Sequence, residues 1–130
     1  MKTPIRLFLV LFLVVLPSRA VPAQTPATKR VMREKLAHSQ MILEAILTSN
    51  FALLDRESAA LARATEDPAW TVLKGPEYLR QSEAFLKTLK ELRDAAKDHD
   101  LDSAAERYTV LTMNCFGCHR YMKGRRLADK

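Results

Sequence analysis

Both cysteines of the chain lie in one five-residue run near its C-terminal end, Cys115-Phe116-Gly117-Cys118-His119. Two thiols at this spacing can form thioether bonds with the two vinyl groups of one porphyrin, and the histidine that follows can bind its iron. The run therefore predicts covalent attachment of a c-type haem through Cys115 and Cys118, with His119 as the proximal iron ligand.

The run alone leaves three other uses of the cysteines open. Two thiols supply half of a four-ligand zinc site, although His38 and His99 are distant in the sequence. A redox-active Cys-x-x-Cys pair usually accompanies a βαβ pattern, which this sequence lacks. A structural disulfide would close a very short loop and would contribute little to stability. A haem-free exported helical protein that uses its cysteines in one of these ways is therefore the alternative.

Residues 1–23 have the composition of a secretory signal peptide. Lys2 and Arg6 precede an unbroken apolar run of ten residues, and small residues surround an expected cleavage point after Ala23. The run is half of the roughly 20 residues that a transmembrane helix needs. We therefore expect the mature domain, residues 24–130, to be periplasmic and to lack a membrane span. Export agrees with the haem prediction, because bacterial c-type haem is attached outside the cytoplasm.

The charge of the expected mature domain is modest. The whole chain carries a formal charge of +6, but residues 24–130 hold 18 basic and 15 acidic residues, which leaves +3. This balance is not that of a nucleic-acid-binding protein. A local excess lies at the C-terminal end, where the basic residues are Arg120, Lys123, Arg125, Arg126 and Lys130. We expect either a solvated tail or a patch that steers an acidic redox partner.

Four segments have apolar residues at helical spacing, at about 29–49, 51–65, 76–97 and 101–124. The chain has three glycines and no strand-like alternation, so an all-α fold is expected. Short connections between amphipathic segments of this length predict an antiparallel four-helix bundle with the haem c attachment motif in its last helix. Trp70, in the connector before the third segment, is expected in the core.

The first segment contains the candidates for the second axial iron ligand. On a helical wheel its buried face is expected to centre on Met32, with His38 on the flank and Met41 toward solvent. The other members of this expected face are Leu36, Leu43, Ile46 and Leu47. The first and last helices of a bundle are neighbours, so the early turns of this segment should lie opposite the motif. Met32 is therefore the preferred ligand, His38 is a second candidate, and an open sixth position is a third possibility.

The late position of the Cys-x-x-Cys-His run in a helical chain resembles the class II c-type cytochromes, the cytochrome c′ and cytochrome c-556 group. The aromatic and basic residues after the run, Arg120, Tyr121 and Lys123, are similar to that family's pattern. The resemblance implies a four-helix bundle that binds one haem c.

The same resemblance implies roles for individual residues. Cys115 and Cys118 would form the thioether bonds, and His119 would be the proximal ligand. In the low-spin members a methionine of the first helix is the distal ligand, which implies Met32.

Together these observations predict a periplasmic monohaem cytochrome that transfers electrons, with iron held by His119 and Met32. We expect a carrier and not an enzyme, because no acid–base pair converges on the distal region. Its partner would be a redox protein, and a homodimer is an open alternative. The alternative function is a five-coordinate, cytochrome c′-like protein that binds NO or CO.

Overall fold

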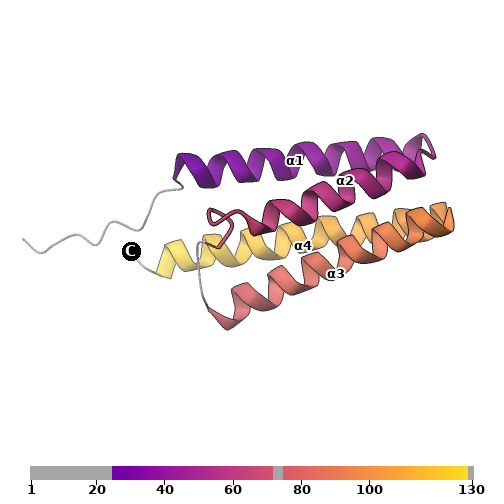
Figure 1. The fold of residues 1–130 in the computed structure, drawn as a ribbon. Helices are drawn as coiled ribbons and strands as arrows, with labels where there is room; N and C mark the ends of the chain where they lie inside the picture. Colours follow the sequence, from indigo (N-terminus) through magenta and orange to yellow (C-terminus); the bar gives the residue numbers. More distant parts are fainter. Residues whose placement is uncertain (1–24, 72–74, 129–130) are drawn as a thin grey trace, which may run out of the picture.

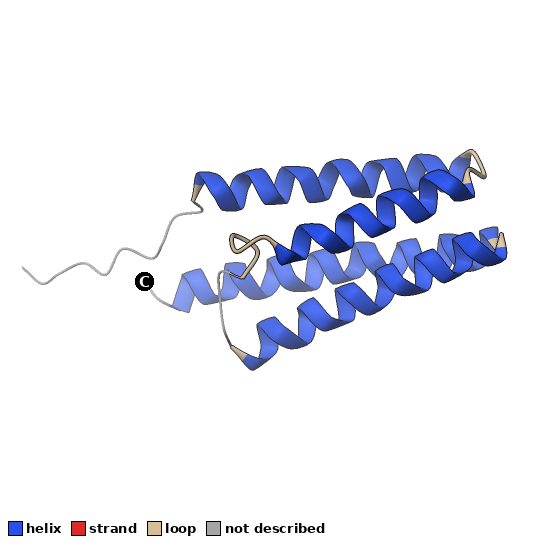
Figure 2. Ribbon diagram, in the orientation of Figure 1, coloured by secondary structure: helices blue, strands red, loops and turns tan. Residues whose placement is uncertain are grey.

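The computed structural model describes residues 25–71 and 75–128, so the expected signal peptide (1–23) lies outside the described residues. The described residues form four long helices and one short 3-10 helix, Ala64–Glu66. The long helices are α1 (Pro26–Leu47), α2 (Phe51–Arg63), α3 (Pro76–Asp98) and α4 (Leu101–Ala128). Figure 2 shows no strand in this part of the chain. The prediction of an all-α protein with four helices is therefore confirmed.

The four helices lie side by side, and successive helices run in opposite directions (Figure 1). The neighbouring pairs α1–α2, α2–α3 and α3–α4 make extensive contacts, whereas α1 makes far fewer contacts with α4. The start of α1 and the C-terminal end of α4 lie at the same end of the molecule. The C-terminal half of α4, which carries the cysteine run, is therefore level with the early turns of α1.

Side-chain caps fix the starts of α2 and α4, each of which follows a tight reversal of the chain. Asn50 Oδ1 accepts a hydrogen bond of 3.0 Å from the backbone N–H of Leu53 at the start of α2. Asp100 Oδ1 accepts one of 2.9 Å from the N–H of Ser103 at the start of α4. At its other end α4 continues beyond Gly124, where the sequence predicted its end, to Ala128.

Apolar side chains of all four helices form one core. Its fully buried members include Val31, Ile42, Leu54, Leu61, Leu89, Leu92 and Leu111. Trp70 is 6% exposed, as the sequence predicted. Its Nε1–H donates to Ser82 Oγ at 3.4 Å, and the hydroxyl of Tyr78 donates to its backbone carbonyl. These two hydrogen bonds hold Trp70, which precedes α3, against the core.

The buried face of α1 differs from the predicted one. Leu36, Leu43 and Leu47 are 58%, 40% and 76% exposed, so the prediction that they are buried is wrong. The residues that α1 does bury are Thr28, Val31, Lys35, Ile42, Ala45 and Ile46. The centre of this face is rotated by about 80° from Met32.

Met32 therefore lies at the edge of the buried face, where it is half-buried against the core, and not at its centre. Met41 was expected to face solvent, but it is half-buried and also packs on the core. The predicted face was drawn through apolar residues alone, so it left out Lys35, which the structure buries between Val31 and Ile42 on the same face.

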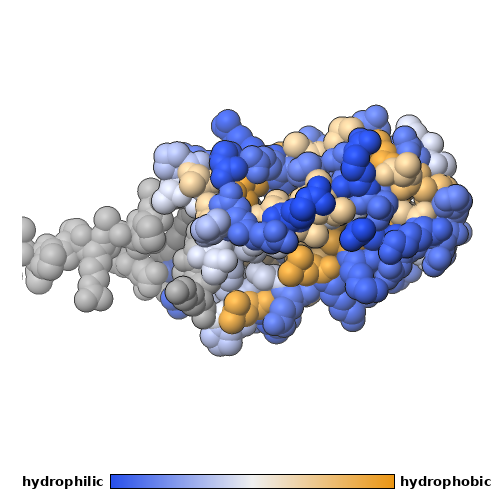
Figure 3. Space-filling model, in the orientation of Figure 1, coloured by the Kyte–Doolittle hydropathy of each residue, from blue (hydrophilic) through white to orange (hydrophobic). Residues whose placement is uncertain are grey.

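The face of the molecule seen in Figure 3 is largely hydrophilic, and its apolar surface is divided among several separate areas. No helix in the described ranges combines the length and the apolar character needed to span a membrane.

Candidate functional site

The Cys-x-x-Cys-His run lies within α4, so Cys115 and Cys118 are one helical turn apart on the same face. Both are half-buried, and neither thiol is in a disulfide. Cys115 packs against the hydrophobic core. His119 is exposed. The helix thus holds two free thiols together at the edge of the core, with the imidazole beside them.

Lys35 of α1 is buried in the interior beside these thiols. It is only 7% exposed, and its Nζ lies 4.6 Å from the ring centroid of Trp70 and 4.2 Å from that of Phe85. Aromatic ring faces attract a cation at such distances. No carboxylate among the described residues compensates its charge. Among the described residues, Lys35 is therefore a buried amine whose favourable partners are ring faces and the two thiols.

Lys35 and the thiols influence one another electrostatically. Burial lowers the pKa of Lys35, and the charges of Cys115 and Cys118 oppose this shift. Burial raises the pKa of the Cys118 thiol, and the ammonium of Lys35 partly offsets that effect.

We call the region between Met32 and Lys35 on α1 and Cys115 and Cys118 on α4 the α1–α4 seam. It coincides with the helix pair that makes few contacts. The aromatic rings of Trp70 and Phe85, whose centroids are 5.4 Å apart, both contact the Lys35 amine. On its two helices the seam therefore carries two thiols, an amine and a thioether.

A second buried polar group, the hydroxyl of Ser58, lies in the core. Ser58 is fully buried, and no described group forms a hydrogen bond with its Oγ. Its neighbour in α2, Glu57, contacts His38, and His38 is one helical turn from Lys35 on α1. Buried polar groups without partners are unusual, because each costs about 1–3 kcal/mol. Among the described residues, Ser58 Oγ thus has no hydrogen-bond partner, and the Lys35 amine is held against ring faces and not by a carboxylate.

His38, the second ligand candidate, lies on the α2 side of α1. Its Nδ1 is 2.8 Å from Glu57 Oε2. This hydrogen bond, and to a smaller extent one from Arg56, holds the pKa of Glu57 below its usual range. The carboxylate is therefore ionised, and the Nδ1–H of His38 is the donor. Met32 lies at the opposite edge of the buried face of α1. The structure thus separates the two candidates that the sequence proposed.

The other side of α4 packs closely on α3. Asn114 Nδ2 donates to Thr88 Oγ1 at 2.9 Å and to the carbonyl of Ala84 at 3.3 Å. Arg107 Nη1 donates to Glu91 Oε2 at 3.2 Å. Since Asn114 directly precedes Cys115, these bonds fix the rotation of α4 at the start of the cysteine run.

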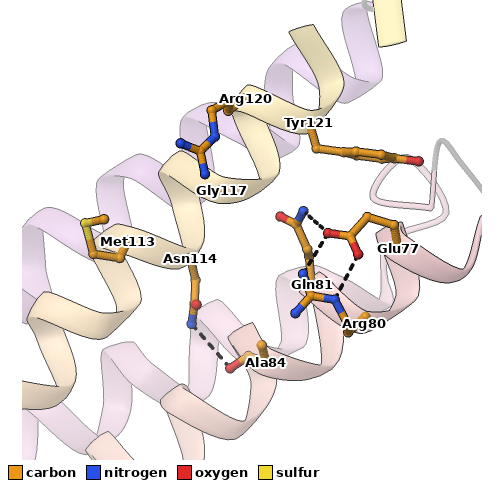
Figure 4. A pocket seen from close by; sticks show the side chains of 9 residues that line it. All are labelled: Glu77, Arg80, Gln81, Ala84, Met113, Asn114, Gly117, Arg120 and Tyr121. Carbon is orange, nitrogen blue, oxygen red and sulfur yellow. Dashed lines mark hydrogen bonds and ion pairs between the residues drawn. The ribbon is translucent and has the colours of Figure 1, made fainter. Parts of the chain in front are cut away.

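A surface pocket of about 370 Å³ lies between α3 and α4 (Figure 4). Gly117, Arg120 and Tyr121 line it from α4. From α3, the Glu77 carboxylate accepts hydrogen bonds from Arg80 and Gln81. These bonds lower the pKa of Glu77 to about 2, and the bond from Arg80 has the larger effect. The pocket adjoins the cysteine run through Gly117, but it lies on the α3 side of α4 and not in the seam.

The half of α4 that carries the run is basic. From residue 108 to residue 128 the sequence contains no Asp or Glu. Arg120, Lys123 and Arg125 are exposed there, next to the exposed apolar side chains of Met113 and Phe116. The surface around the run therefore has a positive charge that neighbouring acidic residues on the same helix do not neutralise.

Within the described part of the chain, no cluster of three or more His, Cys, Asp or Glu residues is placed to hold a metal ion. The comparisons with known proteins give no relative: no family model matches the chain, and neither the curated proteins nor the solved structures contain a match.

The sequence predictions missed Lys35 and Ser58 as residues of the site. The sequence does contain a signal that Lys35 is buried. Lys35 lies four residues after Val31 and seven before Ile42, so the three residues share one face of a helix. Taking these three residues as one face would have placed Lys35 in the interior. The unpaired Oγ of Ser58 depends on its tertiary surroundings, and no pattern in the sequence indicates it.

Proposed function

We propose that this chain is a periplasmic electron carrier, a monohaem c-type cytochrome with the four-helix bundle of the class II group. Residues 1–23 would direct export, and residues 24–130 would form the haem domain. Cys115 and Cys118 would hold the haem covalently, and His119 would be the proximal iron ligand.

The observation that carries this proposal is the placement of the two thiols. They lie free, one helical turn apart, on the face of α4 that is directed at the sparsely packed α1–α4 seam. The donor chemistry fits a haem, because two thiols and the adjacent imidazole lie on α4 and further donors lie on α1. The buried Lys35 amine, which no described carboxylate neutralises, and the Oγ of Ser58, which has no described hydrogen-bond partner, also support a bound group here.

The chain's own residues would bind and orient the cofactor, which supplies one-electron chemistry at its iron. The bonds from Asn114 to α3 would fix the rotation of α4, and thereby the direction of both thiols. A second axial ligand would come from α1, and Met32 is the candidate that the sequence offers. Two axial ligands favour electron transfer, since they leave no site for an exogenous ligand.

The partner would be a redox protein with an acidic surface. Arg120, Lys123 and Arg125 are exposed next to the cysteine run, so they can steer such a partner toward the cofactor. We propose no catalytic residues, because the domain acts as a carrier.

The alternative is a five-coordinate protein that binds NO or CO. The half-buried position of Met32 at the edge of its face favours this alternative, because a methionine held there can leave the sixth position open.

Optical spectra of the protein, produced with a haem-attachment system, separate the two functions. An electron carrier gives a low-spin spectrum in both oxidation states and does not bind CO. A high-spin ferrous form that binds CO readily would overturn electron transfer in favour of gas binding. A folded, exported protein with no haem absorbance would overturn both.

A further inference from the structure

The side chain of α1 that is buried beside the cysteines is Lys35. Lys35 lies about 20° from the centre of the buried face of α1, and Met32 lies about 80° from it. Lys35 is 7% exposed, whereas Met32 is only half-buried. An axial ligand must extend from the helix into the interior, and of these two residues Lys35 does so more directly.

We propose that the amine of Lys35 is the second axial ligand of the ferric iron, with Met32 in the apolar wall beside it. This inference rests on the proposed function, because it requires the haem. A neutral amine is a good nitrogen donor for iron, as an imidazole is. Burial already favours the neutral form of Lys35, since it lowers the pKa of this side chain.

The main competing role for Lys35 is an ion pair with a haem propionate. The interior position argues against it. An ion pair over the faces of Trp70 and Phe85 would remove two charges from water, and that penalty can exceed the attraction between them. A neutral amine on the iron leaves no buried ammonium. Binding to iron therefore needs only the neutral form of Lys35, which burial favours.

Three substitutions at position 35 separate these roles. Lys35→Ala removes the donor. Lys35→Arg keeps the positive charge, but a guanidinium does not deprotonate and cannot bind iron. Lys35→Met replaces the amine with a thioether. Met32→Ala tests the competing ligand, and Lys87→Ala, an exposed lysine of α3, is the matched control.

The readouts are ferric electron paramagnetic resonance, the optical charge-transfer band of a methionine–iron bond, and the reduction potential. We expect a low-spin ferric wild type without the methionine band, and high-spin spectra for Lys35→Ala and Lys35→Arg. Met32→Ala and Lys87→Ala should stay low-spin. Lys35→Met should gain the methionine band and a higher potential, because thioether ligation raises the potential.

Other results would overturn the inference in distinguishable ways. If Lys35→Ala stays low-spin and Met32→Ala becomes high-spin, Met32 is the ligand and the proposed function stands. If Lys35→Arg stays low-spin while Lys35→Ala does not, Lys35 acts through its charge and not as a ligand. A high-spin ferric wild type overturns Lys35 ligation. Protein that is folded but carries no haem removes both the inference and the proposed function.

Discussion

The two sides of α4 differ in how they are held. Toward α3, Asn114 and Arg107 form hydrogen bonds and ion pairs, and the two helices are in extensive contact. Toward α1, contacts are few, and the groups present are two thiols and the buried amine of Lys35. Hydrogen bonds between side chains and backbone hold α3 and α4 together, whereas at the α1–α4 seam the described residues place a buried amine without a carboxylate partner.

This difference indicates that the two faces of α4 have different roles. The α3 side sets the rotation of α4, because Asn114 directly precedes Cys115 in the chain. On the proposed function, the seam side would present both thiols to the haem while the α3 side keeps the helix in place. Substitutions on the α3 side should therefore act on stability, and substitutions in the seam should act on the cofactor.

The largest expected effect is at the thiols. The double substitution Cys115→Ala/Cys118→Ala should abolish covalent haem, because no thioether bond can form. The measurement is haem staining of the protein after denaturing electrophoresis. Phe116→Ala, an exposed position within the same run, should keep full staining. Staining that persists in the double variant would show that the seam does not hold the cofactor.

On the α3 side, Asn114→Ala should destabilise the protein by about 1–2 kcal/mol, because Thr88 and Ala84 each lose one hydrogen bond and keep the one between them. Urea unfolding measures the free energy of unfolding. Met113→Ala, the exposed neighbour on the same helix, should change it by less than about 0.5 kcal/mol. Equal effects at both positions would contradict the assignment of Asn114 to a structural interface.

When haem is absent, a substitution in the seam should raise the free energy of unfolding, whereas Asn114→Ala lowers it. In the Cys115→Ala/Cys118→Ala background, Lys35→Leu should stabilise the protein by on the order of 1 kcal/mol, because it removes an unpaired buried charge. A loss of stability would show that the ring contacts of Lys35 outweigh its desolvation.

The gain from Lys35→Leu should also depend on pH. The folded pKa of Lys35 is lowered, so over the window between the folded and the unfolded pKa the unfolded chain binds more protons. Stability with Lys35 therefore rises with pH across this window, and the advantage of leucine should shrink there. Urea unfolding at neutral and alkaline pH measures both curves.

The smallest expected effect concerns His38 and Glu57, which join α1 to α2. The lowered pKa of Glu57 means that its ionised form stabilises the fold above the usual carboxylate pKa, and that this contribution disappears as the pH falls through the folded pKa. Glu57→Gln should flatten the acid limb of the stability curve by less than about 1 kcal/mol. The exposed Glu83→Gln serves as the control, and an equal effect there would contradict the account.

The sequence predicted the four helices well, because apolar periodicity and capping residues such as Asn50 and Asp100 are local signals. It also predicted that Trp70 is buried. It failed on the rotation of α1, because a helical wheel treats every lysine as exposed. A long lysine stem can pack in an interior when ring faces receive its ammonium, and only the tertiary fold brings Trp70 and Phe85 to Lys35.

The candidate site was predictable in part. The spacing of Cys115 and Cys118 indicates the chemistry without any structure. The partner of His38 and the unpaired Oγ of Ser58 depend on contacts between helices that are distant in the sequence. The wheel therefore placed Met32 at the centre of the buried face of α1, whereas the structure places Lys35 nearer to that centre.

The central claim is that this chain carries a covalent haem at Cys115 and Cys118. The most direct test is the intact mass of the full chain, expressed with a haem-attachment system and purified from the periplasm. The account predicts a mature chain that is heavier by one haem, with the added mass on the tryptic peptide that contains both cysteines. A folded, exported protein with unmodified thiols would contradict it.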